Sequence, residues 1–245
     1  MSAPIEVFFF PTVNGWKVTI ALEEMGFPYT LTSVNIRAGD QHRPDFVKLS
    51  PNHRMPAIID PDGPDGKPIS IFESGAILLY LGRKSGQFYP EDPRARAEVE
   101  QWLMWQLSGL GPMTGQLGHF LIYAPLLAEN PDQLTYARDR YDREVKRLYG
   151  VLNERLEGRD FIAGDYSIAD MATWPFVIGH SFMKLDIGEF PNIKHWLDRV
   201  GARPAVQRGR AAGADFAAQT SQISVAEKAA SLKALFGREA AVAKT

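Results

Sequence analysis

The spacing of apolar residues changes near Asp92, and this change constrains the fold more than any other feature of the 245-residue chain. Before it, short apolar runs alternate with stretches rich in glycine and proline. After it, glycine and proline thin out and apolar residues recur at helical intervals. We therefore expect an α/β part over residues 1–86 and an all-helical part over residues 94–215, joined by a linker rich in glycine, proline and acids.

The α/β part is predicted to follow the order β-α-β-α-β-β-α. The strand–helix–strand unit at its start implies a parallel pair of strands. The turn-rich stretch DPDGPDGKP between the last two strands implies an antiparallel hairpin in the same sheet. The expected strands are 5–10, 29–36, 57–59 and 69–72, and the expected helices are 15–25, 44–49 and 74–84.

The second part is predicted to contain helices over 94–110, 132–156, 167–183, 191–200 and 204–212. Pro112 falls in a helical pattern and should kink or end that helix. Ser167 and Asp170 have the spacing of a capping box, which we interpret as a folding signal and not as a site. A helical tail is expected over 216–245, with an apolar face between Val225 and Phe236.

The chain contains no cysteine, so it has no disulfide, no thiolate metal site and no thiol nucleophile of its own. Any sulfur chemistry must therefore use a sulfur that arrives on a ligand. The five histidines lack metal-ligand spacing, and we expect no metal. The net charge of −2 and the short apolar runs argue against nucleic-acid and membrane partners. The N-terminus has no secretory signal pattern, which predicts a cytoplasmic protein.

Two short motifs admit both a structural and a binding role. Pro56 stands directly before a strand, where a cis Met55–Pro56 bond would turn the Met55 backbone outward to pair with a peptide ligand; the alternative is an ordinary strand-opening proline. Glu73 and Ser74 begin an apolar helix. Ser74 and the helix N-terminus can bind a carboxylate and Glu73 an ammonium group, or Ser74 is only a cap.

The segment PTVNG joins the first strand to the first helix and carries a third candidate pair. Thr12 and Asn14 are good helix-capping residues, which is the simpler interpretation. The functional interpretation is that a hydroxyl, an amide and a helix N-terminus converge where a ligand sulfur would lie. Such donors favour the thiolate form of a thiol.

The order of these motifs resembles the glutathione transferase superfamily. The resemblance is closest to the bacterial nu class and extends to fungal Ure2-like proteins. It covers nearly the whole chain apart from its tail. The stretches that carry it are PTVNGWKV, QHRPDFVKLSPNHRMPAI, FESGAILLYL, QWLMWQLSGLGPMTGQ, RYDREVKRLYGVL and YSIADMATWP. This resemblance implies a thioredoxin-like α/β domain followed by a C-terminal helical bundle, in a protein that forms a homodimer.

The resemblance also implies roles for particular residues. Glu73 and Ser74 would hold the γ-glutamyl group of glutathione, and Met55, before the cis-proline, would pair with the cysteinyl backbone. The glycyl carboxylate would lie near Arg54 and Gln41; relatives often have lysine where this chain has Arg54. Thr12 and Asn14 would lie beside the sulfur as the catalytic pair, and Arg140 would reach a second glutathione or a glutathione disulfide.

Three functions remain open from the sequence. The chain lacks both the catalytic tyrosine and the catalytic cysteine of other transferase classes, so the resemblance favours glutathione-dependent disulfide reduction, with peroxidase and weak conjugating activity on a peroxide or electrophile. The alternatives are a conventional conjugating transferase and a non-catalytic glutathione-binding regulator. The resemblance places four residues near an electrophile pocket, although core packing is the more frequent role for such residues: Trp105, Met113, Gln116 and His119.

Overall fold

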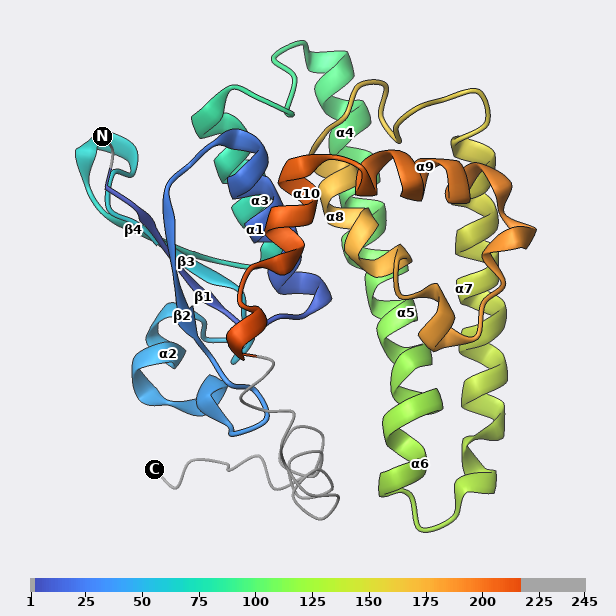
Figure 1. Ribbon diagram of the computed structural model, residues 1–245. Helices are drawn as coiled ribbons and strands as arrows, with labels where there is room; N and C mark the ends of the chain where they lie inside the picture. Colours follow the sequence, from blue (N-terminus) through green and yellow to red (C-terminus); the bar gives the residue numbers. More distant parts are fainter. Residues whose placement is uncertain (1–2, 217–245) are drawn as a thin grey trace.

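The computed structural model of the protein describes residues 3–216. A four-stranded sheet with three helices lies beside a larger helical body, and the expected α/β and all-helical architectures are both present (Figure 1). The predicted helical tail lies outside the described residues, except for Phe216. Within the described part of the chain, no helix is long and apolar enough to cross a membrane.

The sheet has the strand order β2-β1-β3-β4. β1 pairs in parallel with β2, as the strand–helix–strand pattern predicts, and in antiparallel fashion with β3. β3 and β4 form the predicted antiparallel hairpin. The strands are β1 (Ile5–Phe9), β2 (Tyr29–Ser33), β3 (Ala57–Asp60) and β4 (Ile69–Phe72).

Alternating side chains of β1 supply two separate cores. Val7 and Phe9 are fully buried on the face covered by α1 (Val13–Met25) and α3 (Ser74–Ser85). Phe8 points to the opposite face, where its ring lies 6.2 Å from that of Phe46 in α2 (Pro44–Leu49). The sheet is therefore covered on both faces, and the end of β1 leads directly into α1 (Figure 1).

Several element boundaries differ from the prediction; the helix expected over 167–183, for example, ends at Val177. Two of the differences have clear local causes. α1 begins two residues early because the Thr12 side chain caps it, accepting the Gly15 N–H at 3.3 Å. β2 ends at Ser33 and not at Ile36, since the Asn35 N–H turns to the Asp40 carboxylate at 2.9 Å. That bond takes the chain out of the sheet and into the loop that carries Gln41.

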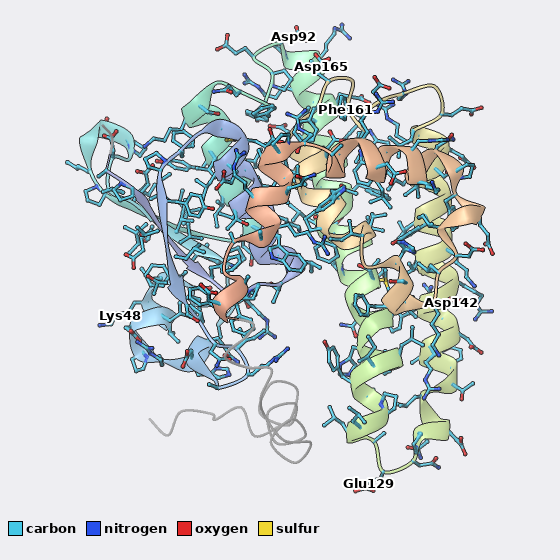
Figure 2. The ribbon with its side chains drawn as sticks, viewed as in Figure 1. Lys48, Asp92, Glu129, Asp142, Phe161 and Asp165 are labelled. Carbon is cyan, nitrogen blue, oxygen red and sulfur yellow. The ribbon has the colours of Figure 1, made fainter. Side chains whose placement is uncertain are left out.

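The helical body contains seven α-helices within residues 3–216, and the pattern did not predict α5 and α6. α5 and α7 lie side by side, and their connection near Glu129 forms the far tip of the body (Figures 1 and 2). The helices are α4 (Pro93–Trp105), α5 (Gly111–Gly118), α6 (Ala124–Leu127), α7 (Thr135–Arg155), α8 (Ile168–Val177), α9 (Pro191–Gly201) and α10 (Pro204–Ala211).

The helical backbone continues past Pro112, so the expected end of the helix does not occur there. A π-helical segment, Gln106–Leu110, precedes α5, and the Gly111 N–H bonds to the Gln106 carbonyl five residues earlier. Pro112 then lies in the first turn of α5, where a missing N–H costs little. The change of register thus accommodates the proline and places Gln106 at the junction of the two parts.

The capping box at α8 is present as predicted, with the Ser167 side chain and the Asp170 carboxylate each accepting a backbone N–H. Asp170 is fully buried. The core around it is continuous with the core of the α/β part, because α1 packs on both α8 and α10. The division into domains at 1–86 and 94–215 therefore stays a prediction.

Candidate functional site

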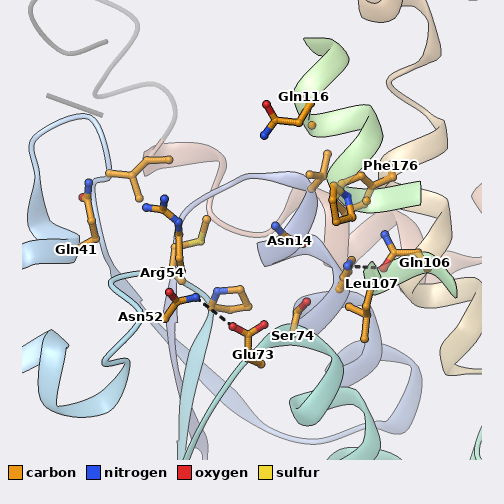
Figure 3. Close-up of a pocket in the computed structure, with 18 of the residues that line it drawn as sticks. Asn14, Gln41, Asn52, Arg54, Glu73, Ser74, Gln106, Leu107, Gln116 and Phe176 are labelled. Atoms are coloured by element: carbon orange, nitrogen blue, oxygen red, sulfur yellow. Dashed lines mark hydrogen bonds between the residues drawn. The ribbon is translucent and has the colours of Figure 1, made fainter. Parts of the chain in front are cut away.

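A cavity of about 720 Å³ opens between the sheet part and the helical body (Figure 3). Its walls come from the start of α1, the loops before α2 and β3, and the start of α3. The helical body contributes α5, the π-helical segments Gln106–Leu110 and His119–Tyr123 on either side of it, and α8. This volume suits a ligand of a few hundred daltons. Six of the eight residues that the resemblance assigns to glutathione line it: Asn14, Gln41, Arg54, Met55, Glu73 and Ser74.

The wall before β3 carries Arg54, Met55 and Pro56, and the Met55–Pro56 bond is cis. Pro56 is buried while the Arg54 side chain is exposed at the cavity. Ser50 fixes this turn, since its hydroxyl donates to the Arg54 carbonyl at 2.7 Å. The loop therefore presents one cation and one peptide edge to the cavity.

The start of α3 forms the floor near this wall. Ser74 is the first helical residue and is buried at the cavity, where unpaired helix N–H groups favour an anion. Glu73 precedes it with a φ of 71°, a conformation that costs energy in a residue with a side chain. Asn52 donates to the Glu73 carboxylate at 3.3 Å (Figure 3). The start of α3 thus offers the Glu73 carboxylate, which can bind an ammonium group of a ligand. Beside it lie hydrogen-bond donors that can bind a carboxylate of the same ligand.

The start of α1 brings two short polar side chains near the cavity. Asn14 lines it directly. Thr12 lies beside Met55, and its hydroxyl donates to the Met55 sulfur at 3.7 Å. The capping interpretation of Thr12 is confirmed, since the same hydroxyl accepts the Gly15 N–H. Thr12 is not among the residues that line the cavity, and its place beside a ligand sulfur stays a prediction.

Gln41 is buried at the cavity wall with only 2% of its surface exposed. Its Nε2 lies 3.3 Å from Nε2 of His42, and its Oε1 has no hydrogen-bond partner within residues 3–216. A buried oxygen without a donor costs free energy, so a ligand N–H would stabilise this arrangement.

Lys17 is one of the cavity residues that the sequence analysis missed, together with its partner Gln106. It is 1% exposed, its Nζ donates to Oε1 of Gln106 at 2.7 Å, and it lies 4.7 Å from the centre of the Phe176 ring. Burial lowers the pKa of Lys17 to about 7, which the charge of Glu73 partly opposes. The sequence could have indicated that Lys17 is buried, because this lysine lies between the apolar residues Trp16 and Val18 on a helix with a buried face.

The remaining predicted residues divide between the cavity and its surroundings. Gln116 and His119 line the cavity, and Gln116 lies on the side opposite Glu73 (Figure 3). Trp105 and Met113 pack against the core. Arg140 is not part of the cavity lining. It lies on α7, about half exposed, with its guanidinium 3.8 Å from the Glu144 carboxylate.

Within residues 3–216 there is no group of three or more histidine, aspartate or glutamate side chains that could hold a metal ion. The polar groups of the cavity are amides, two imidazoles, the hydroxyls of Ser74 and Tyr123, one carboxylate and the basic groups of Lys17 and Arg54. This set is suited to an organic ligand that carries both carboxylates and an ammonium group.

Comparison with known families identifies both parts of the chain. Residues 3–83 match the family described as glutathione S-transferase, N-terminal domain. Residues 119–204 match the family described as glutathione S-transferase, C-terminal domain.

Similar proteins match over most of their length. The disulfide-bond oxidoreductase YfcG of Escherichia coli is 46% identical over 82% of this chain and 92% of its own. A transferase from Burkholderia graminis, solved with two glutathione molecules per subunit, has 48% identity and a TM-score of 0.80 over 86% of this chain and 88% of its own. One from Pseudomonas putida, solved with one glutathione disulfide per subunit, has 42% identity and a TM-score of 0.79 over 86% and 92%.

Proposed function

The chain belongs to the glutathione S-transferase family, and from this we propose that it is an enzyme that binds glutathione between its two parts and uses it to reduce disulfide bonds. The observation that carries the proposal is the pairing of this cavity with a chain that has no cysteine. Both reacting thiols must therefore be brought in by ligands. The similarity to a disulfide-bond oxidoreductase, and to transferases solved with two glutathiones or with glutathione disulfide, supports the same chemistry.

The first glutathione binds between the two charged ends of the cavity, Glu73 at the start of α3 and Arg54 before β3. Glu73 binds the ammonium group of the γ-glutamyl residue, and Ser74 with the N-terminus of α3 binds its carboxylate. The backbone of Met55 pairs with the cysteinyl residue. Arg54 and Gln41 take the glycyl end, where Arg54 supplies the charge and Gln41 Oε1 accepts the last peptide N–H.

The sulfur then lies near the start of α1. Asn14 donates a hydrogen bond that favours the thiolate, and Thr12 does the same once its hydroxyl proton turns from the Met55 sulfur to the ligand sulfur. The thiolate attacks one sulfur of the substrate disulfide, forming a mixed disulfide and releasing one substrate thiolate, which takes up a proton. A second glutathione thiolate attacks the glutathione sulfur of the mixed disulfide and releases the second substrate thiol. Two glutathiones are oxidised to one glutathione disulfide, and one substrate disulfide is reduced to two thiols.

The test is steady-state kinetics with a small dialkyl disulfide and glutathione. The Thr12→Ala, Asn14→Ala double variant should lose most of the turnover with little change in the affinity for glutathione. An unchanged rate would remove both residues from the mechanism. Absence of glutathione binding in the unaltered protein would overturn the proposal as a whole, and binding without turnover of any disulfide, peroxide or aryl halide would favour the regulator.

Arg140 is assigned to the second glutathione in this proposal because the family resemblance gives that role to this arginine of the helical part; it lies on α7, outside the lining of the first site. Arg140→Ala should raise KM for the second glutathione and leave binding of the first unchanged. Arg143→Ala is the matched control on the same helix, because Arg143 bonds only to the Asp139 carbonyl within the described chain. Equal effects of the two substitutions would remove Arg140 from the site.

Conjugation of an electrophile is the second candidate function. The side of the cavity formed by Leu107, Pro112 and Phe176 is apolar and would accept a hydrophobic substrate. Mass spectrometry of the products separates the two reactions, since conjugation yields a thioether and disulfide reduction yields glutathione disulfide.

The proposal includes a homodimer in the cytoplasm. Phe72 on β4 and Met104 on α4 are large apolar side chains that are 36% and 45% exposed, and a second copy would cover them. A reaction that consumes reduced glutathione also requires a compartment with a reducing glutathione pool. Light scattering of the purified protein tests the dimer.

A further inference from the structure

Lys17 is a buried cation in the wall of the proposed glutathione site. It follows Asn14 by three positions on α1, so the two side chains lie on the same side of the helix, one turn apart. Lysine is rarely buried without a partner. The fold nevertheless leaves only 1% of this residue exposed, between Gln106 and Phe176 at the junction of the two parts.

The pair of Lys17 and Gln106 has more donors than acceptors. A lysine ammonium has three N–H groups, and within residues 3–216 its one hydrogen-bond acceptor is Oε1 of Gln106, at 2.7 Å. Nε2 of the same Gln106 is buried and has no hydrogen-bond partner in that range. Buried donors of this kind need an acceptor. Both residues line the cavity, so the ligand can provide it.

We infer that Lys17 receives the proton of the glutathione thiol and, as an ammonium ion held by Gln106, stabilises the resulting thiolate. This inference rests on the proposed function. The S–H bond breaks, its proton moves to the neutral Nζ, and the sulfur keeps the electron pair. No oxidant or other co-reactant takes part. Asn14 and Thr12 donate to the sulfur, but neither can hold its proton at neutral pH, and Lys17 fills that role.

The charges around Lys17 are consistent with this exchange. Burial lowers its pKa to about 7, so a neutral amine is available near neutral pH. Glu73 is the charged group that opposes this effect. The other titratable groups of the cavity are His53 and Arg54 before β3, and His119 and Tyr123 beyond α5. Once a thiolate forms, the two opposite charges in a poorly hydrated site each favour the charged form of the other.

Two substitutions separate charge from packing. Lys17→Met keeps the length and the apolar stem, and Lys17→Arg keeps the charge. Lys48→Met is the control, since Lys48 is exposed on α2 away from the cavity (Figure 2). The readout is a spectroscopic pH titration of the thiolate absorbance of bound glutathione, together with calorimetric affinities for glutathione and for S-methylglutathione, which has no thiol proton.

Lys17→Met should raise the pKa of the bound thiol by about 1 or more, which lowers the thiolate fraction near neutral pH roughly tenfold. Its affinity for S-methylglutathione should stay near that of the unaltered protein, and Lys17→Arg should restore part of the thiolate. Thermal unfolding verifies that the variants are folded; if Lys17→Met does not fold, Lys17→Gln replaces it in the titration.

The outcomes distinguish this inference from the proposed function. If the unaltered protein binds glutathione and reduces a disulfide, but the thiol titrates identically in the unaltered protein and in Lys17→Met, the inference about Lys17 is wrong and the proposed function stands. If the unaltered protein binds no glutathione, both are wrong. Equal losses of affinity for glutathione and S-methylglutathione would reduce Lys17 to a packing role.

Discussion

Thr19 in α1 donates its hydroxyl proton to the carbonyl oxygen of Gly209 in α10, at 2.7 Å and across 190 positions of sequence. Both groups are buried, and the bond forms where α10 returns to lie against the α/β part (Figure 1). The close approach depends on the missing side chain of Gly209. A Cβ atom there would lie 2.6 Å from the backbone of Ile20.

Substitution of Gly209 should therefore separate α1 from α10. Gly209→Ala is expected to destabilise the protein by about 1 to 3 kcal/mol, because backbone atoms of Ile20 cannot move aside as a flexible side chain would. Gly150→Ala in α7 is the matched control. A Cβ at Gly150 meets nothing within 4 Å, so alanine should stabilise that helix by about 0.5 to 1 kcal/mol. Denaturant unfolding checks both, and a neutral Gly209→Ala would contradict the close packing.

Asp170 should be among the most sensitive positions for stability. Its buried carboxylate accepts N–H groups from Ile162 at 3.0 Å, Ser167 at 3.1 Å and the Trp196 indole at 2.8 Å. Asp170→Ala leaves these donors unpaired and should cost about 3 to 5 kcal/mol.

The control for Asp170 is Asp92→Ala, which removes an exposed cap that accepts the N–H groups of Arg94 and Ala95 at the start of α4. Exposed caps contribute about 1 kcal/mol. Thermal or urea unfolding of both variants measures the difference, and losses of similar size would show that burial of Asp170 adds nothing to its capping role.

The stability of the ligand-free protein should depend on pH through Lys17. Burial lowers the pKa of Lys17 to about 7 in the folded chain, whereas an unfolded lysine has a pKa of about 10.4. Between these values the unfolded chain holds the additional proton. The free energy of unfolding should therefore rise as the pH increases from about 7 to about 10, by up to about 5 kcal/mol.

Lys17→Met removes this titration. The free energy of unfolding of the variant should therefore exceed that of the unaltered protein most at pH 7 and below, and this difference should shrink at higher pH. Urea unfolding at several pH values measures the difference in free energy of unfolding between the two proteins. The contributions of all other titrating groups cancel in this difference. Parallel pH profiles would show that Lys17 does not titrate in this window.

Glu73 and Ser74 should make unequal contributions to glutathione affinity. Glu73→Gln removes the charge opposite the ligand ammonium group and should weaken binding by roughly 10- to 100-fold. Ser74→Ala removes a neutral hydroxyl, but the N–H groups of α3 remain, so a loss of about tenfold or less is expected.

Glu129→Gln, at the far tip of the helical body, is the control for the loss of one negative charge (Figure 2). Isothermal calorimetry with reduced glutathione measures all three variants. An affinity of Glu73→Gln equal to that of Glu129→Gln would remove Glu73 from the ligand.

Local signals carried most of the sequence prediction. The limits of α2 and β4 agree with the structure, because a helix-starting proline and a turn-rich stretch act over a few residues. The Ser167–Asp170 box is also local and was predicted correctly. The sequence did not predict α5 and α6, since the change to π-helical register before Pro112 depends on how that segment packs.

The sequence by itself determined the order of the strands and helices in the α/β part, the capping residues, the absence of a protein thiol and the motifs that resemble one family. These depend on neighbours in the chain. Only the tertiary structure decided that Lys17 meets Gln106 at a distance of 89 positions, that Thr19 meets Gly209, and that Arg140 lies outside the cavity. Such contacts depend on how two helices cross and on which side chains their approach buries, and helical spacing alone does not encode that choice.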